Sequence, residues 1–362
     1  MRKNSMIFIS YIDSENATSG SRLRPKEMLK GFKEQGLHVL TLAGDQYAPS
    51  RKKDIQKLLT QIKTEKPAFC YIESPTYPIM KHRDRKLIKQ LHRQGIKIGY
   101  FYRDFYRKFP MRSGRRSISR AMKDKLLDFL QWRTDRVLRY CDIVYFPSEQ
   151  CKELFSFKDM RSLPPAGENH LPSVPKPVNY TCIYVGGIVG HYDGKLLLDT
   201  FEELAKRDNR YKLILVCRKD EWDRLEHPAK QAEWLEVHHT SGDELAALYG
   251  RAQIGLISHR ADDQYNKYVI PVKTFEYMSY GLPIVSVNVE ALAGFIEQED
   301  IGLVVHASPS DFADGIQKIL ESYECYSEYC RRVSQKLLTQ NLWSHRAQSV
   351  IRDLGSLEKQ NG

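Results

Sequence analysis

The chain has no long hydrophobic run and no paired cysteine motif. The first absence argues against a membrane-spanning protein, and the second against a zinc-binding or disulfide-bonded one. None of its apolar stretches reaches the roughly 18–20 residues that a membrane-spanning helix needs. Residues 1–10 combine a basic flank with an apolar run that is too short for a secretory signal peptide. The 7 cysteines are scattered without a Cys-x-x-Cys pair, which predicts reduced packing residues rather than zinc ligands or disulfides. The sequence therefore predicts a cytoplasmic protein.

Charge of one sign is concentrated in one half of the chain. Residues 1–168 contain 35 Lys and Arg against 18 Asp and Glu, a net charge of +17, whereas the remaining residues contain 21 and 27, a net charge of −6. Such a basic half favours an anionic partner, which can be a membrane surface, a phosphorylated substrate or a nucleic acid. No recognised nucleic-acid-binding motif accompanies the charge, so nucleic acid is not an expected partner.

Short apolar runs alternate with helical patterns along the whole chain. We expect strands at residues 6–11, 37–42, 68–72, 96–102, 142–146, 180–185, 211–217, 234–238, 253–258, 284–289 and 302–305. Strands that alternate with helices predict parallel sheets with helices on both faces. A proline-rich connector at 162–177 interrupts this rhythm. The sequence therefore predicts an α/β fold with two doubly wound, Rossmann-like domains facing a central cleft.

The segment from residue 271 to 283 carries the clearest chemistry. Pro271 suits the first turn of a helix, and the backbone N–H groups near Lys273 and Thr274 would then point at an anion. Lys273 adds a positive charge, and Glu276 follows one turn later on the same face, where it can accept hydrogen bonds from two neighbouring hydroxyls. Gly281 ends the helix. A phosphate site beside a diol-binding carboxylate predicts a nucleotide diphosphate site.

This segment resembles the P-x-K-x-x-E-Y-x-x-x-G-x-P-V-V pattern of the group 1, or family-4-like, glycosyltransferases, which have the GT-B fold. The matching residues are Pro271, Lys273, Glu276, Tyr277, Gly281, Pro283, Ile284 and Val285. Residues 184–187 and 242–256 look like the first strand with its glycine turn and the helix and strand before the donor site. The resemblance implies an acceptor-binding domain at 1–168, a nucleotide-sugar-binding domain at 178–340, and a terminal helix at 341–362 that packs back on the first domain.

The resemblance implies a hexosyltransferase-type enzyme that moves a sugar from a nucleotide-diphosphate sugar, UDP- or GDP-linked, to a lipid-linked or polysaccharide acceptor in bacterial-type cell-surface glycan synthesis. No further cofactor is required, and no catalytic metal is implied, because no Asp-x-Asp motif follows a strand. Many retaining members have a second glutamate eight positions before Glu276, where this chain has Tyr268. This leaves retention or inversion open, and two alternatives stand: an epimerase of the same fold or a non-catalytic scaffold.

Donor-binding residues are assigned by the same resemblance. The candidates are Gly186, Gly187, Arg218, Lys219, His238, His239, Lys273, Thr274 and Glu276. The two glycines would let the backbone approach the phosphate or the sugar. Lys273 and the amide of Thr274 would hold the diphosphate, with Arg218 and Lys219 as further phosphate candidates at a strand end. Glu276 would bind the ribose, and the two histidines would lie near the base.

The first domain offers the acceptor side and the catalytic candidates. The turn after the first strand contains Gly20, Ser21, Arg22 and Arg24, which could contact an acceptor or donor phosphate. Asp104 follows the strand that carries an acidic or histidine residue in the resembled family, so it is the candidate base, with Arg103 orienting it. Asp13 and Glu73 also follow strands and are weaker candidates for the base.

Aromatic residues are interleaved with the basic clusters of this half. Tyr102, Phe105, Tyr106 and Phe109 lie between basic groups in 81–93 and 107–120. Basic and aromatic loops suit docking on an anionic bilayer, where an isoprenoid-diphosphate-linked acceptor would be held. The sequence thus predicts peripheral association with the inner face of a membrane, and it indicates no oligomeric state.

Overall fold

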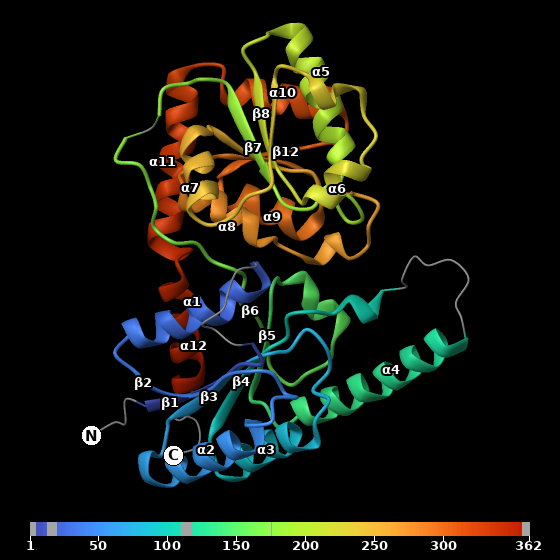
Figure 1. Ribbon diagram of the computed structural model, residues 1–362. Helices are drawn as coiled ribbons and strands as arrows, with labels where there is room; N and C mark the ends of the chain where they lie inside the picture. The colour runs from blue at the N-terminus through green and yellow to red at the C-terminus, as the bar shows by residue number, and fades with distance from the viewer. Residues whose placement is uncertain (1–4, 13–19, 110–117, 175, 357–362) are drawn as a thin grey trace. The chain divides into compact units, whose positions relative to one another are not determined.

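The computed structural model describes residues 5–12, 20–109, 118–174 and 176–356. The chain divides into two compact units (Figure 1): one combines Met1–Pro164 with Trp343–Gly362, and the other is Pro165–Leu342. None of the helices in the described ranges is both long and apolar enough to cross a membrane.

The first unit is built on a parallel sheet with the strand order β2-β1-β3-β4-β5-β6. Its strands are β1 (Ser5–Ile9), β2 (His38–Leu42), β3 (Phe69–Glu73), β4 (Lys97–Phe101), β5 (Ile143–Phe146) and β6 (Met160–Ser162). Its helices are α1 (Gly20–Glu34), α2 (Arg51–Glu65), α3 (His82–Arg93), α4 (Ile118–Leu138) and α12 (Trp343–Ser356). Strands β1 and β3 are buried along their whole length, as parallel strands covered by helices on both faces are.

Helix α12 brings the far end of the chain into the first unit. It lies along α1 (Figure 1), at a place where a Cβ atom on Gly31 would lie 3.1 Å from Cβ of Ala347. Farther along the helix, Asp353 accepts a hydrogen bond from the Tyr145 hydroxyl at 3.2 Å and pairs with Arg161 at 2.7 Å. Trp343 is buried, so it serves packing.

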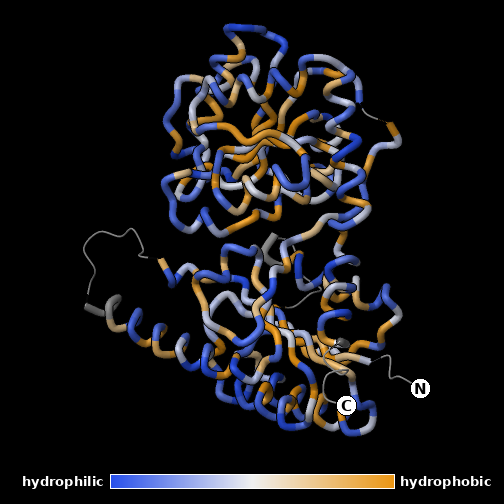
Figure 2. The backbone as a smooth tube through the Cα atoms, turned by 180° about the vertical axis from the view of Figure 1, so that it is seen from behind, coloured by the Kyte–Doolittle hydropathy of each residue, from blue (hydrophilic) through white to orange (hydrophobic). Residues whose placement is uncertain are grey.

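The second unit contains a parallel sheet with the order β12-β11-β10-β7-β8-β9. Its strands are β7 (Thr181–Val185), β8 (Lys212–Val216), β9 (Leu235–His238), β10 (Ile254–Ile257), β11 (Ile284–Val287) and β12 (Gly302–Val305). Its helices are α5 (Gly194–Arg207), α6 (Lys219–Arg224), α7 (Asp243–Arg251), α8 (Val272–Ser279), α9 (Glu290–Glu299), α10 (Pro309–Ile319) and α11 (Tyr323–Gln340). Figure 2 shows the hydrophobic residues gathered along the strands inside each unit.

The α/β class and the two Rossmann-like sheets predicted from the sequence are confirmed. One local difference has a physical reason. Strand β6 (Met160–Ser162) is only 3 residues long, too short to show a period of two, and it was not predicted.

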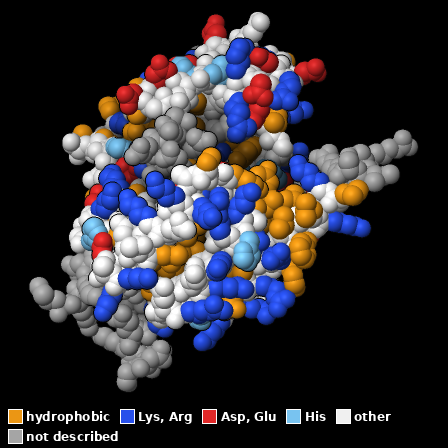
Figure 3. Space-filling model, turned by 60° about the horizontal axis from the view of Figure 1, so that its bottom comes forward, with side chains coloured by type: hydrophobic (Ala, Val, Ile, Leu, Met, Phe, Trp, Pro, Cys, Tyr) orange, Lys and Arg blue, Asp and Glu red, His pale blue; other side chains and the backbone are white. Residues whose placement is uncertain are grey.

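Lysine and arginine side chains cover much of the first unit. Figure 3 shows them spread over the face that is turned toward the viewer, with hydrophobic side chains gathered beside them. The excess positive charge of the first half of the sequence thus lies on the surface, because Lys and Arg are rarely fully buried unless they are paired.

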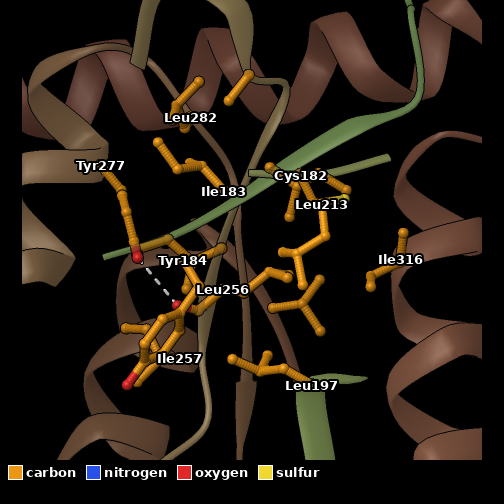
Figure 4. Close-up of a cluster of buried hydrophobic side chains, with 14 of the residues drawn as sticks. Cys182, Ile183, Tyr184, Leu197, Leu213, Leu256, Ile257, Tyr277, Leu282 and Ile316 are labelled. Carbon is orange, nitrogen blue, oxygen red and sulfur yellow. Dashed lines mark hydrogen bonds between the residues drawn. The ribbon is translucent and has the colours of Figure 1, made fainter. Parts of the chain in front are cut away.

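Tyr277 of α8 connects the helix to the second sheet (Figure 4). Its hydroxyl accepts a hydrogen bond from the amide of Val185 at 3.1 Å and donates one to the carbonyl of Leu256 at 3.0 Å. The ring lies against Gly255, where a Cβ atom would be only 2.3 Å from a ring carbon. Gly255 is therefore required by packing, and Tyr277 fixes the position of α8 over β7 and β10.

We expect Gly255→Ala to destabilise the protein by about 1–3 kcal/mol, because the added methyl overpacks a buried contact. Gly250→Ala in α7 is the matched control, since nothing lies within 4 Å of a Cβ atom there; a helical Gly→Ala change is neutral or stabilising by up to about 1 kcal/mol. Urea unfolding of both variants measures the difference. Equal stability of the two variants would show that Tyr277 can move without cost.

Candidate functional site

The strand order of the second sheet reverses at β7. The chain adds β8 and β9 on one side of β7, and then β10, β11 and β12 on the other. In open α/β sheets the loops that leave two such strands diverge, which opens a crevice at their carboxyl ends where ligands bind. Here Gly186 follows β7 and His259 follows β10, and both lie beside the start of α8.

Lys273, in the first turn of α8, places a buried ammonium at this switch point. The residue is 8% exposed, and among the described residues its Nζ atom has no hydrogen-bond partner. Nζ lies 4.2 Å from the ring centroid of Tyr184 and 4.7 Å from that of Tyr192. Burial lowers the pKa of the ammonium to about 7, against the attraction of Glu276. Ring faces compensate a buried cation only in part, so the site favours an incoming anion.

Two glycines make room for this arrangement. Gly186 has φ of 135°, a conformation that favours glycine, and a Cβ atom on it would lie 2.9 Å from Nζ of Lys273. A Cβ atom on Gly187 would lie 2.7 Å from the Tyr192 ring. The sequence assigned the glycines to the approach of a phosphate or sugar; in the structure, Lys273 and Tyr192 occupy the space beside them.

Glu276 and Thr274 continue the site along α8. The half-buried carboxylate of Glu276 accepts a hydrogen bond from the Tyr249 hydroxyl at 3.1 Å, and burial raises its pKa. The Thr274 hydroxyl is buried, and no partner for it lies in the described part of the chain. Its amide, the predicted diphosphate donor, already donates to the carbonyl of Pro271 at 3.1 Å. Pro271 is the residue before the helix rather than its first residue.

His259 is a site residue that the sequence analysis did not single out. It is buried, and its Nδ1 atom has no hydrogen-bond partner among the described residues. Its ring lies 5.2 Å from that of Tyr192. Burial, reinforced by the charges of Lys273 and His191, lowers its pKa well below the usual value, so the ring is neutral near pH 7. The sequence held one indication that His259 belongs to the site, because this residue follows the strand expected at 253–258.

Arg218 and Lys219 lie after β8, the other neighbour of β7. Their side chains are 74% and 71% exposed, and they pair with Glu221 and Asp223. Glu221 is buried and also accepts a hydrogen bond from the amide of Ile188 at 2.8 Å, so it holds the loop after β7. Arg218 therefore stands at the switch-point edge with its guanidinium engaged by a carboxylate.

His238 and His239 lie where β9 ends. Nδ1 of His239 is 2.8 Å from the carbonyl oxygen of Cys217, which joins the ends of β8 and β9. Nε2 of His238 is 2.6 Å from Glu236. Both rings lie farther along the sheet than Lys273, on the β9 side of β7.

In the first unit, Arg24 has a structural role rather than the predicted phosphate contact. Its guanidinium is buried, pairs with Glu73 at 3.1 Å, donates to the carbonyl of Leu163 at 3.1 Å, and lies 3.4 Å from the Phe101 ring centroid. Glu73, a weaker candidate for the base, is the carboxylate partner in this ion pair. Gly20, Ser21 and Arg22 begin α1, and their side chains lie outside the described residues, as does Asp13.

Asp104 and Arg103 follow β4 and form an ion pair. Nε of Arg103 is 3.0 Å from Oδ2 of Asp104. The backbone amide of Arg103 donates to Ser74 at 3.0 Å, and its guanidinium donates to Thr76 at 2.7 Å. Burial raises the pKa of Asp104, and Arg103 lowers it in part. The ion pair therefore lies after β4, at the carboxyl edge of the first sheet.

The aromatic residues predicted to face a membrane are largely buried. Tyr102 and Phe105 are 5% and 2% exposed. Their rings pack on Phe155, with centroids at 4.7 and 6.4 Å, and Phe109 packs on Phe105 at 6.2 Å. Tyr106 is 45% exposed, so three of the four aromatic residues serve the core of the unit and one remains at its surface.

One set of potential metal ligands, Asp199, Glu202 and His227, lies within 4.8 Å. Nδ1 of His227 accepts a hydrogen bond from the amide of Ala229 at 3.2 Å, so Nε2 carries the proton and donates to Asp199 at 2.9 Å. Neither nitrogen of the ring then offers a lone pair to a cation.

Comparisons with known proteins give a family match within the second unit and several solved structures of similar fold. Residues 179–322 match the family model described as Glycosyl transferases group 1. Sucrose-phosphate synthase from Thermosynechococcus elongatus is similar in structure, with a TM-score of 0.64, 15% identity, and 98% of each chain covered. No curated protein matches in sequence.

Two further solved structures share the fold. WaaG, a glycosyltransferase involved in lipopolysaccharide biosynthesis, matches with a TM-score of 0.60 and 13% identity, covering 96% of this chain and 99% of its own. HepE from Anabaena, in complex with UDP and glucose, matches with a TM-score of 0.62 and 12% identity, covering 97% and 99%. At such identities the likeness shows the fold. The chain thus has the GT-B fold. The match to the group 1 glycosyl transferases lies within its second unit.

We expect Lys273→Met to raise the stability of the ligand-free protein by about 1–4 kcal/mol, because a buried charge is replaced by an apolar group of similar length. The folded-state pKa of about 7 lies below the ordinary 10.5, so the penalty is full below pH 7 and disappears as the pH rises toward 10.5. Thermal unfolding near pH 6.5 measures the gain. Lys206→Met, at an exposed position of α5, is the control, and a gain no larger than in this control would contradict the assignment.

Proposed function

We propose that the protein transfers a sugar from a UDP- or GDP-sugar to a hydroxyl of a lipid-linked or polysaccharide acceptor. The observation that carries the donor assignment is the buried Lys273 ammonium without a hydrogen-bond partner in the described residues. A diphosphate at the start of α8 would supply the missing counter-charge. Glu276, one turn further along α8, would accept hydrogen bonds from the ribose hydroxyls.

The likeness to HepE supports a uridine nucleotide as the first choice, since the structures of that protein contain UDP, UDP with glucose, or UDP-glucose. Arg218, Lys219, His238 and His239 lie on the β8 and β9 side of the switch point. We assign the arginine and lysine to the diphosphate and the histidines to the base. Arg218 would have to leave Glu221 to reach a phosphate.

For the chemical step we assign Asp104 of the first unit as the base that takes the proton from the acceptor hydroxyl. Its raised pKa brings the carboxylate closer to the range in which general bases work. Arg103 would orient it. The basic surface of the first unit would attract an acceptor that carries phosphate or lies at an anionic membrane.

Binding of UDP, GDP, ADP and dTDP, followed by thermal shift, tests the donor site. We expect UDP or GDP to stabilise the protein by about 2.7 kcal/mol at about 100 times Kd. Glu276→Gln should weaken binding by about 1.5–3 kcal/mol, the value of a hydrogen bond to a charged group, whereas Glu297→Gln, at an exposed position of α9, should not. If none of the four nucleotides shifts the unfolding temperature, the donor assignment is wrong.

The same binding should depend on pH through Lys273, whose pKa is about 7. Only the ammonium form attracts a diphosphate, so above this pKa binding must take up a proton. The Kd should then rise by up to about tenfold per pH unit between about pH 7 and 9. Calorimetry in buffers of different ionisation enthalpy would show the proton uptake. A slope that persists in Lys273→Met would assign the titration to another group.

Asp104→Asn should lower kcat by about 10²–10⁴-fold and leave nucleotide affinity unchanged, because a base acts only in the chemical step. Turnover is followed as release of UDP or GDP with lipid-linked and polysaccharide acceptors. Asp135→Asn is the control, since this carboxyl also lies partly buried in the first unit with a raised pKa. Loss of nucleotide affinity in Asp104→Asn would contradict the role, and turnover of the donor without an acceptor would favour an epimerase.

A further inference from the structure

Helix α4 (Ile118–Leu138) carries a group of exposed apolar side chains that the sequence analysis did not single out. Met122, Leu126, Phe129 and Trp132 are 68%, 57%, 50% and 51% exposed. They follow one another at intervals of three or four residues, which places them on one face of a helix. Figures 1 and 2 both show the first half of α4 extending away from the sheet of its unit. The stripe is too large to be explained as scattered surface apolar residues.

Basic residues share this face. Lys125, Arg133 and Arg136 occur at helical intervals from the apolar residues, and all three are exposed. The guanidinium of Arg136 lies 4.9 Å from the Trp132 ring centroid, and that of Arg133 lies 5.8 Å from the Phe129 ring centroid. The apolar stripe and the cations therefore form one surface, which we term the α4 face.

The acidic residues of α4 lie on a different side of the helix. Asp124, Asp128 and Asp135 fall in one arc of the helix. Asp128 pairs with Arg107, and Asp135 accepts hydrogen bonds from Gln131 at 2.8 Å and from Tyr102 at 3.3 Å. Asp128 is 65% exposed, but its charge is paired with that of Arg107. The α4 face is left with aromatic, aliphatic and cationic side chains.

We propose that the α4 face docks on an anionic phospholipid bilayer. Aromatic and aliphatic groups flanked by Lys and Arg are what an interfacial helix needs, because the apolar groups enter the headgroup boundary while the cations remain with the lipid phosphates. The neighbouring α3 adds Lys86, Lys89 and Arg93 to the positive field. The inference adds a lipid surface as partner to the proposed transferase, and it does not need the donor assignment to be correct.

Charge complementarity separates this occupant from a second copy of the chain. In a twofold dimer the same patch meets itself. Lys125, Arg133 and Arg136 of one copy would then approach the same three cations of the other, without a carboxylate on the α4 face to pair with them. An anionic bilayer supplies the opposite charge to all three residues at once.

The test is co-sedimentation with vesicles of equimolar phosphatidylglycerol and phosphatidylcholine, and with vesicles of phosphatidylcholine alone. We expect the full chain to bind the first and not the second. The triple variant Lys125→Gln/Arg133→Gln/Arg136→Gln should lower the partition coefficient on the order of 100-fold. Lys52→Gln/Lys53→Gln/Lys57→Gln in α2 removes the same charge from another exposed surface and should have a much smaller effect.

The apolar contribution is tested with Phe129→Ser/Trp132→Ser, which should reduce binding to the anionic vesicles about tenfold or more. Tyr323→Ser/Leu338→Ser removes two exposed apolar side chains of α11 and is the matched control. In the wild type, Trp132 fluorescence should shift to shorter wavelength on binding and the shift should vanish in Trp132→Ser. Because these side chains are exposed, circular dichroism and unfolding temperature should be unchanged in every variant.

Three results would overturn the proposal: no binding of the wild type to anionic vesicles, equal loss in the α4 and α2 charge variants, or a wild-type dimer that Phe129→Ser/Trp132→Ser dissociates, which would assign the face to a second copy. Nucleotide binding measured without vesicles is a separate readout. It should stay intact in the α4 variants, so failure of the donor assignment and failure of membrane docking can be told apart.

Discussion

The buried ammonium of Lys273 is the constraint on which the second unit's site depends. A cation with aromatic faces as its near neighbours is tolerated only if the surrounding structure holds it in place. Gly186 provides the room beside Nζ, and Tyr277, bonded to Val185 and Leu256, fixes the helix that carries the lysine. The charge of Lys273 is thus only partly compensated at the carboxyl edge of the second sheet, where an anionic ligand would complete the compensation.

Much of the fold was predictable, because a parallel sheet with covering helices demands long apolar strands at regular intervals. The expected strand at 302–305 coincides with β12, and the expected strand at 180–185 contains β7. The shortest of the described strands was not predicted from the sequence. Strand β6 has only 3 residues, and its position is set by pairing with β5, which no pattern in the chain encodes.

The site was predictable in part for a similar reason. Lys273 and Glu276 belong to one short segment whose helical period places both on one face. Tyr184, Tyr192 and His259 come from two other loops and a strand, and only the folded sheet brings them to the lysine. In the first half, composition located the charge correctly but could not separate buried from exposed residues. Arg24 and Tyr102 are buried, whereas Phe129 and Trp132 of α4 are exposed.

Helix α12 has a consequence for the order of events during synthesis. The first unit lacks one of its helices until residues 343–356 leave the ribosome, after the whole of the second unit has been made. Until then the surface of α1 around Gly31, which α12 covers in the native protein, is open to solvent and to other chains. Domains usually fold in the order in which they are translated; here the unit translated first is completed last, and it depends on its successor to deliver the final piece.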